Sequence, residues 1–258
     1  VLRYRRNVTA IQGDHVVHVD RSQFLKDGYV IFRECIPPEM LETLRNQFNI
    51  LVERQKAIWE KEAQIEDLAG GQWETSAQPR LWYDQVTDRE TEATVDFILH
   101  ENTMGISREL MRCEDAAPLC FFLMCSPVKD HGPSAWHRDL HPIDQAPLTG
   151  LQGDLLDNGP GNIQWNVPLY DDDVLWVVPG SHCRTNTVVE NQQLEKDRSV
   201  PLPDSTPVVL EAGDAVAYTN TILHWGSNYS AKLRRTIHFG HRAFGGDMYP
   251  YVPHYYWD

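Results

Sequence analysis

The sequence has little positive charge and no long apolar run, and each absence excludes a class of partner. Its 258 residues include 23 Lys and Arg against 37 Asp and Glu, a formal net charge of −14. Nucleic acids and anionic membrane surfaces are bound through basic patches, so neither is an expected partner. No apolar stretch approaches the length of a membrane-spanning helix. Internal repeats and low-complexity linkers are also absent, whereas 41% hydrophobic residues are enough for a buried core.

The five cysteines lack the pattern of a disulfide framework. The five cysteines are odd in number and show no CxxC spacing, which favours reduced thiols in a cytoplasmic protein. The sequence begins at Val1 rather than at Met, so the native N-terminus and any targeting segment stay open. The oligomeric state, monomer or homodimer, is also open. A chain of this length suits one large domain, and we expect residues 1–258 to form a single one.

Helical patterns come first along the chain and strand patterns come after them. Apolar residues recur every three or four positions over about 38–61, and a second helical region is expected over about 91–112, interrupted near Gly105. Six short strand-like runs come later, at 119–125, 162–169, 174–178, 207–210, 215–218 and 233–239. Many short strands between Gly and Pro turns favour a sandwich or jelly roll, with the helices bracing one face. Residues 152–161 are rich in Gly, Asp and Asn, and we interpret them as a mobile loop near a cavity mouth.

Two segments carry the residues that indicate chemistry. Trp136-His137-Arg138-Asp139 places a histidine and a carboxylate two positions apart, so on a strand both side chains point to the same face. His224 lies 85 residues after Asp139. Two imidazoles and one carboxylate form the facial set that holds Fe(II) and leaves coordination positions open for oxygen chemistry. His137, Asp139 and His224 are therefore the candidate metal ligands and catalytic centre.

The order of these and neighbouring segments resembles the phytanoyl-CoA dioxygenase family of Fe(II)/2-oxoglutarate-dependent oxygenases. The resemblance covers about residues 22–242 and is weak over 60–115. The segments that carry it are Phe24 to Phe32, Ile36 to Met40, Trp136 to Asp139, Val178-Pro-Gly-Ser-His182, Gly213-Asp214, His224 and Arg235.

The resemblance implies a fold that is mainly β with flanking α-helices. Its double-stranded β-helix core, a jelly-roll or cupin-like unit, would span about 116–245, braced by helices at about 20–115. The implied activity is that of a dioxygenase using Fe(II), 2-oxoglutarate and molecular oxygen. Such an enzyme hydroxylates a small-molecule substrate and releases succinate and CO2. The carboxylate of Asp139 argues against a halogenase, which needs that coordination position for chloride.

The resemblance also implies how 2-oxoglutarate is held. Adjacent strand residues point to opposite faces, so only one of Arg234 and Arg235 faces inward. The eleven residues from His224 to Arg235 match the family spacing, so Arg235 is expected to pair with the far carboxylate and Arg234 to be solvated. Trp165 is expected to flank the co-substrate, with a place in the core as the alternative. Ser227, or Thr236, is a candidate donor to the same carboxylate.

Departures from the family pattern leave the substrate open. Asp171-Asp-Asp173 replaces a common Asn-Gly pair, and Ser126 replaces a frequent lysine, so the family name is not taken as the substrate. A pocket with aromatic walls and a few polar groups would suit many small molecules. The candidate substrate residues are Trp82, Tyr83, Trp136, Arg138, His141 and Trp225. His182 is interpreted as a structural turn histidine, while His238 and His241 could line the barrel.

Two alternatives to hydroxylation stay open. The same iron chemistry gives desaturation, epimerisation or ring formation in secondary metabolism, because all of these begin with hydrogen abstraction. A non-catalytic jelly-roll protein that binds metal or ligand is the other alternative. The inward arginine argues against it, since a simple binding module has no need of that group.

Overall fold

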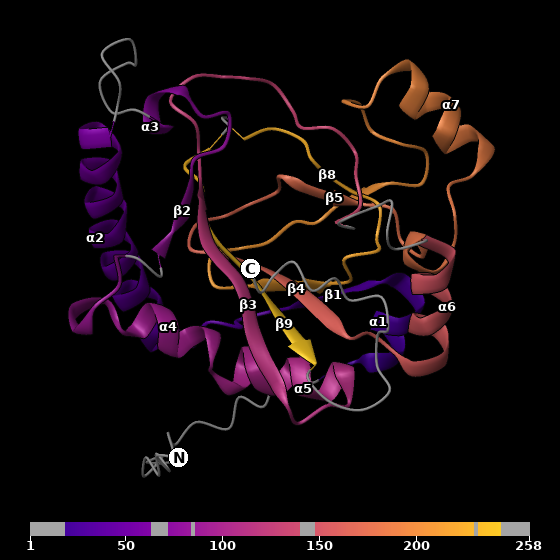
Figure 1. Cartoon of the computed structure of the whole chain (residues 1–258), viewed down its shortest axis with the longest axis horizontal. Coiled ribbons are helices and arrows are strands. Elements are labelled where there is room, and N and C mark those ends of the chain that lie inside the picture. Colours follow the sequence, from indigo (N-terminus) through magenta and orange to yellow (C-terminus); the bar gives the residue numbers. More distant parts are fainter. Residues whose placement is uncertain (1–18, 63–71, 84–85, 140–147, 230–231, 244–258) are drawn as a thin grey trace.

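The computed structural model describes residues 19–62, 72–83, 86–139, 148–229 and 232–243. Helices dominate the first half and strands the second, as the sequence predicts (Figure 1). The helices are α1 (Arg21–Asp27), α2 (Pro38–Glu62), α3 (Gln72–Thr75), α4 (Ala93–Ile98), α5 (Ile106–Met111), α6 (Leu148–Asn158) and α7 (Val188–Lys196). The strands are β1 (Tyr29–Phe32), β2 (Arg80–Trp82), β3 (Ala116–Cys125), β4 (Asn162–Pro168), β5 (Leu175–Val177), β6 (Thr206–Pro207), β7 (Ala215–Tyr218), β8 (His224–Gly226) and β9 (Arg235–Ala243).

The strands of the described residues form two antiparallel sheets. The larger has the order β1-β7-β4-β9-β3-β2, and the smaller has the order β6-β5-β8. Neighbours in the large sheet come from distant parts of the chain, since β4 pairs with both β7 and β9. These crossovers between two facing sheets give the jelly-roll core that the sequence predicts.

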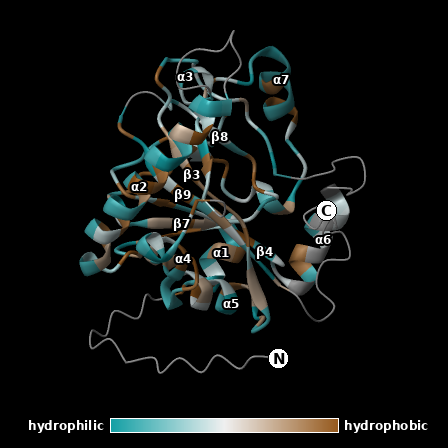
Figure 2. Cartoon of the chain, turned by 60° about the vertical axis from the view of Figure 1, so that its left-hand side comes forward, coloured by the Kyte–Doolittle hydropathy of each residue, from teal (hydrophilic) through white to brown (hydrophobic). Residues whose placement is uncertain are grey.

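The two faces of the large sheet meet different partners. On one face, apolar side chains of β1, β4 and β9 join those of α1, α2, α4 and α5 in the main hydrophobic cluster, which includes Phe24, Phe48, Phe97, Trp165 and Phe239. On the other face, a second cluster packs β7 against β5 through Val216 and Val177. The helices therefore brace one side, and the small sheet closes part of the other (Figure 1). Figure 2 shows hydrophobic ribbon concentrated in the central strands and hydrophilic ribbon on the outer helices.

The interrupted helical region has the break that the sequence predicts. A π-helical turn at Glu101–Gly105 lies between α4 and α5. By contrast, the expected loop over 152–161 is wrong, because α6 covers most of it. Leu155 in this helix is 1% exposed, so burial of an apolar side chain outweighs the loop-forming composition. Gly159 ends the helix in the left-handed conformation, with φ of 87°.

No helix in the described part of the chain has the length and apolar character that a bilayer span requires.

Candidate metal centre and its cavity

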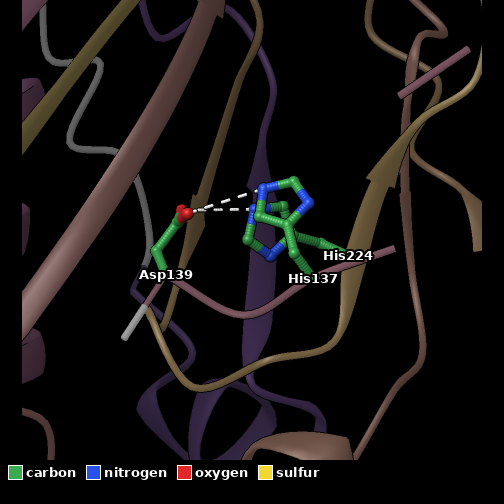
Figure 3. A group of neighbouring side chains, drawn as sticks. All are labelled: His137, Asp139 and His224. Carbon is green, nitrogen blue, oxygen red and sulfur yellow. Dashed lines mark ion pairs between the residues drawn. The ribbon is translucent and has the colours of Figure 1, made fainter. Parts of the chain in front are cut away.

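The local backbone brings the three candidate ligands together. His137 and His224 form an isolated antiparallel bridge, in which each backbone N–H donates to the other's carbonyl at 3.0 Å. The Asp139 N–H donates to the carbonyl of Asn220, also at 3.0 Å, and this extends the pairing. Since His137 and Asp139 are two residues apart on an extended segment, they share one face. One ligand atom from each of the three residues lies within 4.8 Å of the others (Figure 3).

Hydrogen bonds set the orientation of each ligand. The Nδ1 atoms of His137 and His224 lie 2.7 and 3.0 Å from the carbonyls of Ala135 and Ile222. A carbonyl only accepts, so Nδ1 carries the proton and Nε2 is left facing the centre. Asp139 lies 3.5 Å from Nε2 of His137 and 3.2 Å from Nε2 of His224. Gln164 donates to the Asp139 carboxylate from the neighbouring β4 at 2.8 Å. The three ligand atoms therefore converge on one point.

The three ligands also shape one another's protonation. Burial alone raises the pKa of the Asp139 carboxyl, but the nearby charges of His224 and His137 outweigh it and hold that pKa well below its usual range. Burial acts to lower the pKa of His224, yet the Asp139 carboxylate raises it overall. Burial, and then the charge of His224, lowers the pKa of His137. An ionised carboxylate beside two imidazoles suits a divalent cation, because metal ligands must be deprotonated to bind.

A cavity of about 370 Å³ opens beside the three ligands. Its wall comes from both sheets and from the segment before β2. The lining includes His137, Asp139, His224, Gln78, Arg80, Trp82, Cys120, Phe122, Met124, Gln164, Asn166, Tyr218, Arg234 and His238. The candidate metal ligands and several polar groups therefore face a space large enough for small molecules.

Arg234, rather than Arg235, points into this cavity, so the expected orientation of the two arginines is wrong. Arg234 is 5% exposed, its Nε donates to Asp172 at 2.8 Å, and its Nη1 is buried without a hydrogen-bond partner among the described residues. Arg235 instead lies outside the cavity lining, with its guanidinium 5.4 Å from the centre of the Trp73 ring. The alternation along β9 explains the difference, because Arg235 shares a face with Ile237, which is fully buried in the core.

Trp165 does not flank the cavity, and its alternative place in the core is the one observed. The side chain is fully buried between the rings of Phe32 and Phe239, at centroid distances of 5.5 and 6.0 Å. Its indole N–H donates to the hydroxyl of Ser107 at 2.8 Å. Because Trp165 faces the helices, its strand neighbours Gln164 and Asn166 face the cavity.

Ser227 is also outside the cavity lining, so the expectation that it reaches the co-substrate is wrong. Its hydroxyl donates to the carbonyl of Val174 at 3.1 Å and ties the end of β8 to the residue before β5. Thr236 donates its hydroxyl to Asp172, so it supports the partner of Arg234.

The first candidate substrate residues, Trp82 and Tyr83, point in opposite directions. Trp82 lines the cavity and is 45% exposed, so its role as a substrate contact stays a prediction. Tyr83 points the other way, into the core, where it lies edge-on to Phe48 at 5.2 Å. His141 lies outside the described residues.

Three further candidates support the metal site from outside the cavity. Trp136 and Trp225 are buried and stack on each other at 5.4 Å. The Arg138 guanidinium donates to the carbonyls of Ser181 and Thr221, and it holds the turn before β8. The expectation that these three line the cavity is therefore wrong, because residues that flank a strand ligand point to the opposite face.

Three further histidines singled out in the sequence lie within the described residues. Nε2 of His182 lies 3.0 Å from the carbonyl of Leu25, which agrees with a structural turn histidine. His238 lines the cavity, with Nδ1 2.7 Å from Oδ1 of Asn166. His241 is buried among the helices and does not line it.

Sequence reasoning missed several cavity residues, and one signal could have found part of them. Gln164 and Asn166 alternate with Ile163, Trp165 and Val167 along β4, a period-two pattern that predicts two polar side chains on the face away from the core. Gln78 and Arg80 lie in a stretch with no clear pattern, and only the pairing of β2 with β3 brings them to the site.

Solved structures share this fold at low sequence identity. AviO1 from Streptomyces viridochromogenes Tue57 superposes with a TM-score of 0.59 at 18% identity, over 90% of this chain and 95% of AviO1. EctD from S. alaskensis, solved with 2-oxoglutarate and 5-hydroxyectoine, gives 0.58 at 13%, over 86% and 74%. SnoN, an alpha ketoglutarate dependent epimerase from nogalamycin biosynthesis, gives 0.55 at 15%, over 86% and 79%. At these identities the likeness establishes the fold alone.

Sequence comparison establishes the family. No curated protein matches the chain. The family model described as Phytanoyl-CoA dioxygenase (PhyH) matches residues 24–236, which is most of the chain, so the predicted resemblance is confirmed. The match spans all three candidate ligands and both arginines. The chain belongs to the phytanoyl-CoA dioxygenase family and is an Fe(II)/2-oxoglutarate-dependent oxygenase.

Proposed function

We propose that the enzyme hydroxylates a small molecule at an iron held by His137, Asp139 and His224. The observation that carries this proposal is the convergence of these three ligand atoms within 4.8 Å at the wall of a cavity. Two imidazoles and one carboxylate suit Fe(II), and three protein ligands leave positions open for a co-substrate and oxygen. Iron with 2-oxoglutarate and oxygen supplies the oxidising chemistry and releases succinate and CO2.

Arg234 is the residue that we propose for the far carboxylate of 2-oxoglutarate. Its Nη1 is buried beside the cavity without a partner among the described residues, and such a group needs one. An arginine and a carboxylate form strong, directional hydrogen bonds. Asp172 already accepts from Nε, so it fixes the plane in which the fork meets the co-substrate.

The remaining polar groups orient the ligands. Gln164 donates to Oδ2 of Asp139, and this hydrogen bond fixes the rotation of the carboxylate. The two Nδ1 hydrogen bonds hold each imidazole with Nε2 toward the cavity. Loss of a group that orients a ligand in this way typically lowers metal affinity by roughly 10- to 100-fold.

A different outcome on the same iron is the second candidate. SnoN shares this fold and is an epimerase, so the architecture accommodates an outcome other than hydroxylation. Hydrogen abstraction is common to both, and the position of the substrate decides which product forms. Product analysis by mass spectrometry separates them, because hydroxylation adds one oxygen atom and epimerisation leaves the mass unchanged.

Two broader expectations from the sequence belong to this proposal. The helices and both sheets are joined through packed hydrophobic clusters, which supports the assignment of residues 1–258 to one catalytic domain. All five cysteines are free, which agrees with a reducing cytoplasmic location. The oligomeric state stays open.

Anaerobic titration with Fe(II) and 2-oxoglutarate tests the ligand set. The unaltered chain should bind one iron and release succinate when oxygen is admitted with a substrate. His137→Ala, Asp139→Ala and His224→Ala should each lose most of the bound iron while keeping the fold, because the hydrophobic core forms without metal. His131→Ala is the matched control, since His131 is exposed and lies outside the cavity lining. Full iron binding and turnover in two of the three ligand variants would overturn the assignment.

A further inference from the structure

One wall of the cavity is formed by β3 and β2, the last two strands at one edge of the large sheet. These strands lie side by side (Figure 1). Their pairing places Trp82 opposite Phe122 and Arg80 opposite Met124. All four side chains line the cavity, whereas Leu81 between them is buried in the core. Alternation along β2 therefore presents one cation and one large aromatic ring to the same space.

The Arg80 side chain is exposed, contacts Gln78 and Phe122, and still has unused N–H donors. Its Nη2 donates to Oε1 of Gln78 at 3.3 Å, and its carbon centre lies 5.3 Å from the centre of the Phe122 ring. Within the described ranges, Arg80 forms no ion pair with an acidic side chain. A guanidinium has five N–H donors in a planar fork, so one bond to Gln78 leaves an edge free for a two-oxygen group.

The charges around the cavity distinguish Arg80 from Arg234. Asp172 neutralises Arg234, whereas no described side chain neutralises Arg80. Arg80 lines the same cavity as His137 and His238, so its charge faces that space. The chain as a whole has a formal net charge of −14, which disfavours the binding of anions over most of its surface. An unpaired cation at the cavity therefore makes this place favourable for an anion.

An apolar surface leads from Arg80 toward the metal ligands. The Trp82 ring packs on Phe122 at 4.8 Å, and Phe122 packs on the His238 ring at 4.7 Å. Trp82 remains 45% exposed, so its ring offers free surface to a bound molecule. Flat aromatic walls with a few polar groups are typical of small-molecule sites.

We propose that the substrate carries an oxyanion, a carboxylate or a phosphate, on a flat apolar body, and that Arg80 selects it. The oxyanion pairs with the free edge of Arg80, and the body lies against Trp82 and Phe122, so the far part of the molecule points to the ligands. This inference rests on the proposed function, because it places the substrate of that same cavity. Arg80 is then a specificity-determining residue, distinct from the co-substrate arginine.

Calorimetric titration of the iron-free whole chain with three probes tests the proposal. Phenylacetate and phenyl phosphate carry the two kinds of oxyanion, and phenylacetamide is the neutral analogue. At least one anion should bind about tenfold more tightly than the amide, the order expected for a charge-assisted hydrogen bond. The stronger of the two anions identifies the kind of oxyanion. Equal binding of all three probes would overturn the proposal, as would no binding of either anion.

Variants assign the preference to one arginine. Arg80→Gln should abolish the preference for the anion, and Arg80→Lys should retain part of it because the charge remains. Arg89→Gln removes one positive charge from an exposed residue outside the cavity lining and should change nothing. If Arg234→Gln abolished the preference and Arg80→Gln did not, the anion site would belong to the co-substrate arginine. The titration uses the iron-free chain, so a negative result here leaves the iron-ligand assignment untouched. A failure of the anion proposal can therefore be distinguished from a failure of the proposed function.

Discussion

The Arg234 guanidinium has one nitrogen bonded to a buried side chain and another beside the cavity. Asp172 accepts from its Nε, and Thr236 donates its hydroxyl to the same carboxylate. Burial acts to raise the pKa of Asp172, but the charge of Arg234 outweighs it and lowers that pKa. Asp172 therefore stays ionised and compensates the buried cation whether or not the cavity is filled. The unpartnered Nη1 is then free to bind a co-substrate without moving the rest of the fork.

Arg234→Gln should weaken 2-oxoglutarate binding strongly. Loss of one partner from a buried charge pair costs about 3–5 kcal/mol, which corresponds to a rise in Kd of roughly a hundredfold or more. Anaerobic calorimetric titration of 2-oxoglutarate into the Fe(II)-loaded chain measures this change, and thermal unfolding checks that the fold survives. Iron content should stay intact, because Arg234 is not a ligand.

Arg235→Gln is the matched control for that variant. Arg235 lies on the opposite face of the strand, with its guanidinium over Trp73, so its loss should change the Kd by less than about threefold, a small surface contribution. Arg234→Lys should recover part of the affinity because it keeps the charge without the planar fork. A large defect in Arg235→Gln with normal binding in Arg234→Gln would reverse the assignment.

At the scale of one strand, β4 separates two roles between neighbouring residues. Gln164 donates a hydrogen bond to Asp139, a proposed metal ligand, while Trp165 fills the core on the other face. The side chain of Gln164 contributes to the geometry of the centre, and that of Trp165 contributes to the stability of the sheet. Substitutions one residue apart should therefore change different measurable quantities.

Gln164→Leu should lower iron affinity by about tenfold or more, because loss of a group that orients a ligand typically costs roughly 10- to 100-fold. Its free energy of unfolding should change little, since Leu fills similar space. Trp165→Phe should leave iron affinity unchanged and lower the free energy of unfolding by about 1–3 kcal/mol, because the smaller ring leaves a cavity and frees the Ser107 hydroxyl. Metal titration and urea unfolding on both variants check this. Loss of iron affinity in Trp165→Phe alone would contradict it.

The same alternation of strand residues shows how much of the candidate site can be predicted from the sequence. Order and spacing predict the three ligands, because a histidine and an aspartate two apart on an extended segment share a face. Alternation also predicts Arg234 on the face of Thr236 and His238, opposite Ile237 and Phe239. The eleven-residue spacing favours Arg235 instead, but Arg235 lies outside the cavity lining, because a shift of one residue along a strand reverses the face.

Other parts of the site depend on contacts that no local pattern encodes. β2 is three residues long and comes after a weakly patterned region, so its place beside β3 is fixed only by long-range pairing. The helices α2, α4 and α5 carry an apolar stripe that predicts burial, yet not which face of the sheet they cover. The proposed metal ligands follow from residue type and order along the chain, whereas the β2–β3 wall of the cavity depends on the pairing of distant strands.

At the scale of the whole molecule, one buried hydrogen-bond chain joins the helical layer to the sheet. The Trp165 N–H donates to the Ser107 hydroxyl at 2.8 Å, and that hydroxyl lies 2.7 Å from Nδ1 of His241. Nε2 of His241 lies 3.0 Å from the carbonyl of Ile98, so Nε2 carries the proton and Nδ1 accepts from Ser107. β4, α5, β9 and α4 are thereby connected through a neutral imidazole.

This neutral histidine predicts how stability depends on pH. Burial lowers the pKa of His241 to about 4, with the carbonyl of Ile98 opposing it and Arg108 reinforcing it. An unfolded histidine titrates near pH 6.5, so below that pH the unfolded chain binds a proton that the folded chain does not. The stabilisation is fully present above about pH 6.5 and is lost as pH falls toward 4, by up to about 3 kcal/mol at roughly 1.36 kcal/mol per pKa unit.

Urea unfolding of the whole chain at pH 7, 6, 5 and 4 measures this loss against a variant that cannot titrate. His241→Gln should be less stable at pH 7, because it breaks the hydrogen-bond chain, and its stability should fall less steeply between pH 6.5 and 4. His131→Gln, at an exposed position, should retain the slope of the unaltered chain. Carboxylates contribute equally to all three proteins, so the difference in slope isolates His241. If the free energy of unfolding fell equally steeply with pH in the unaltered chain and in His241→Gln, the fold would not hold the imidazole neutral. The connection between the helical layer and the sheet would then not depend on the charge of His241.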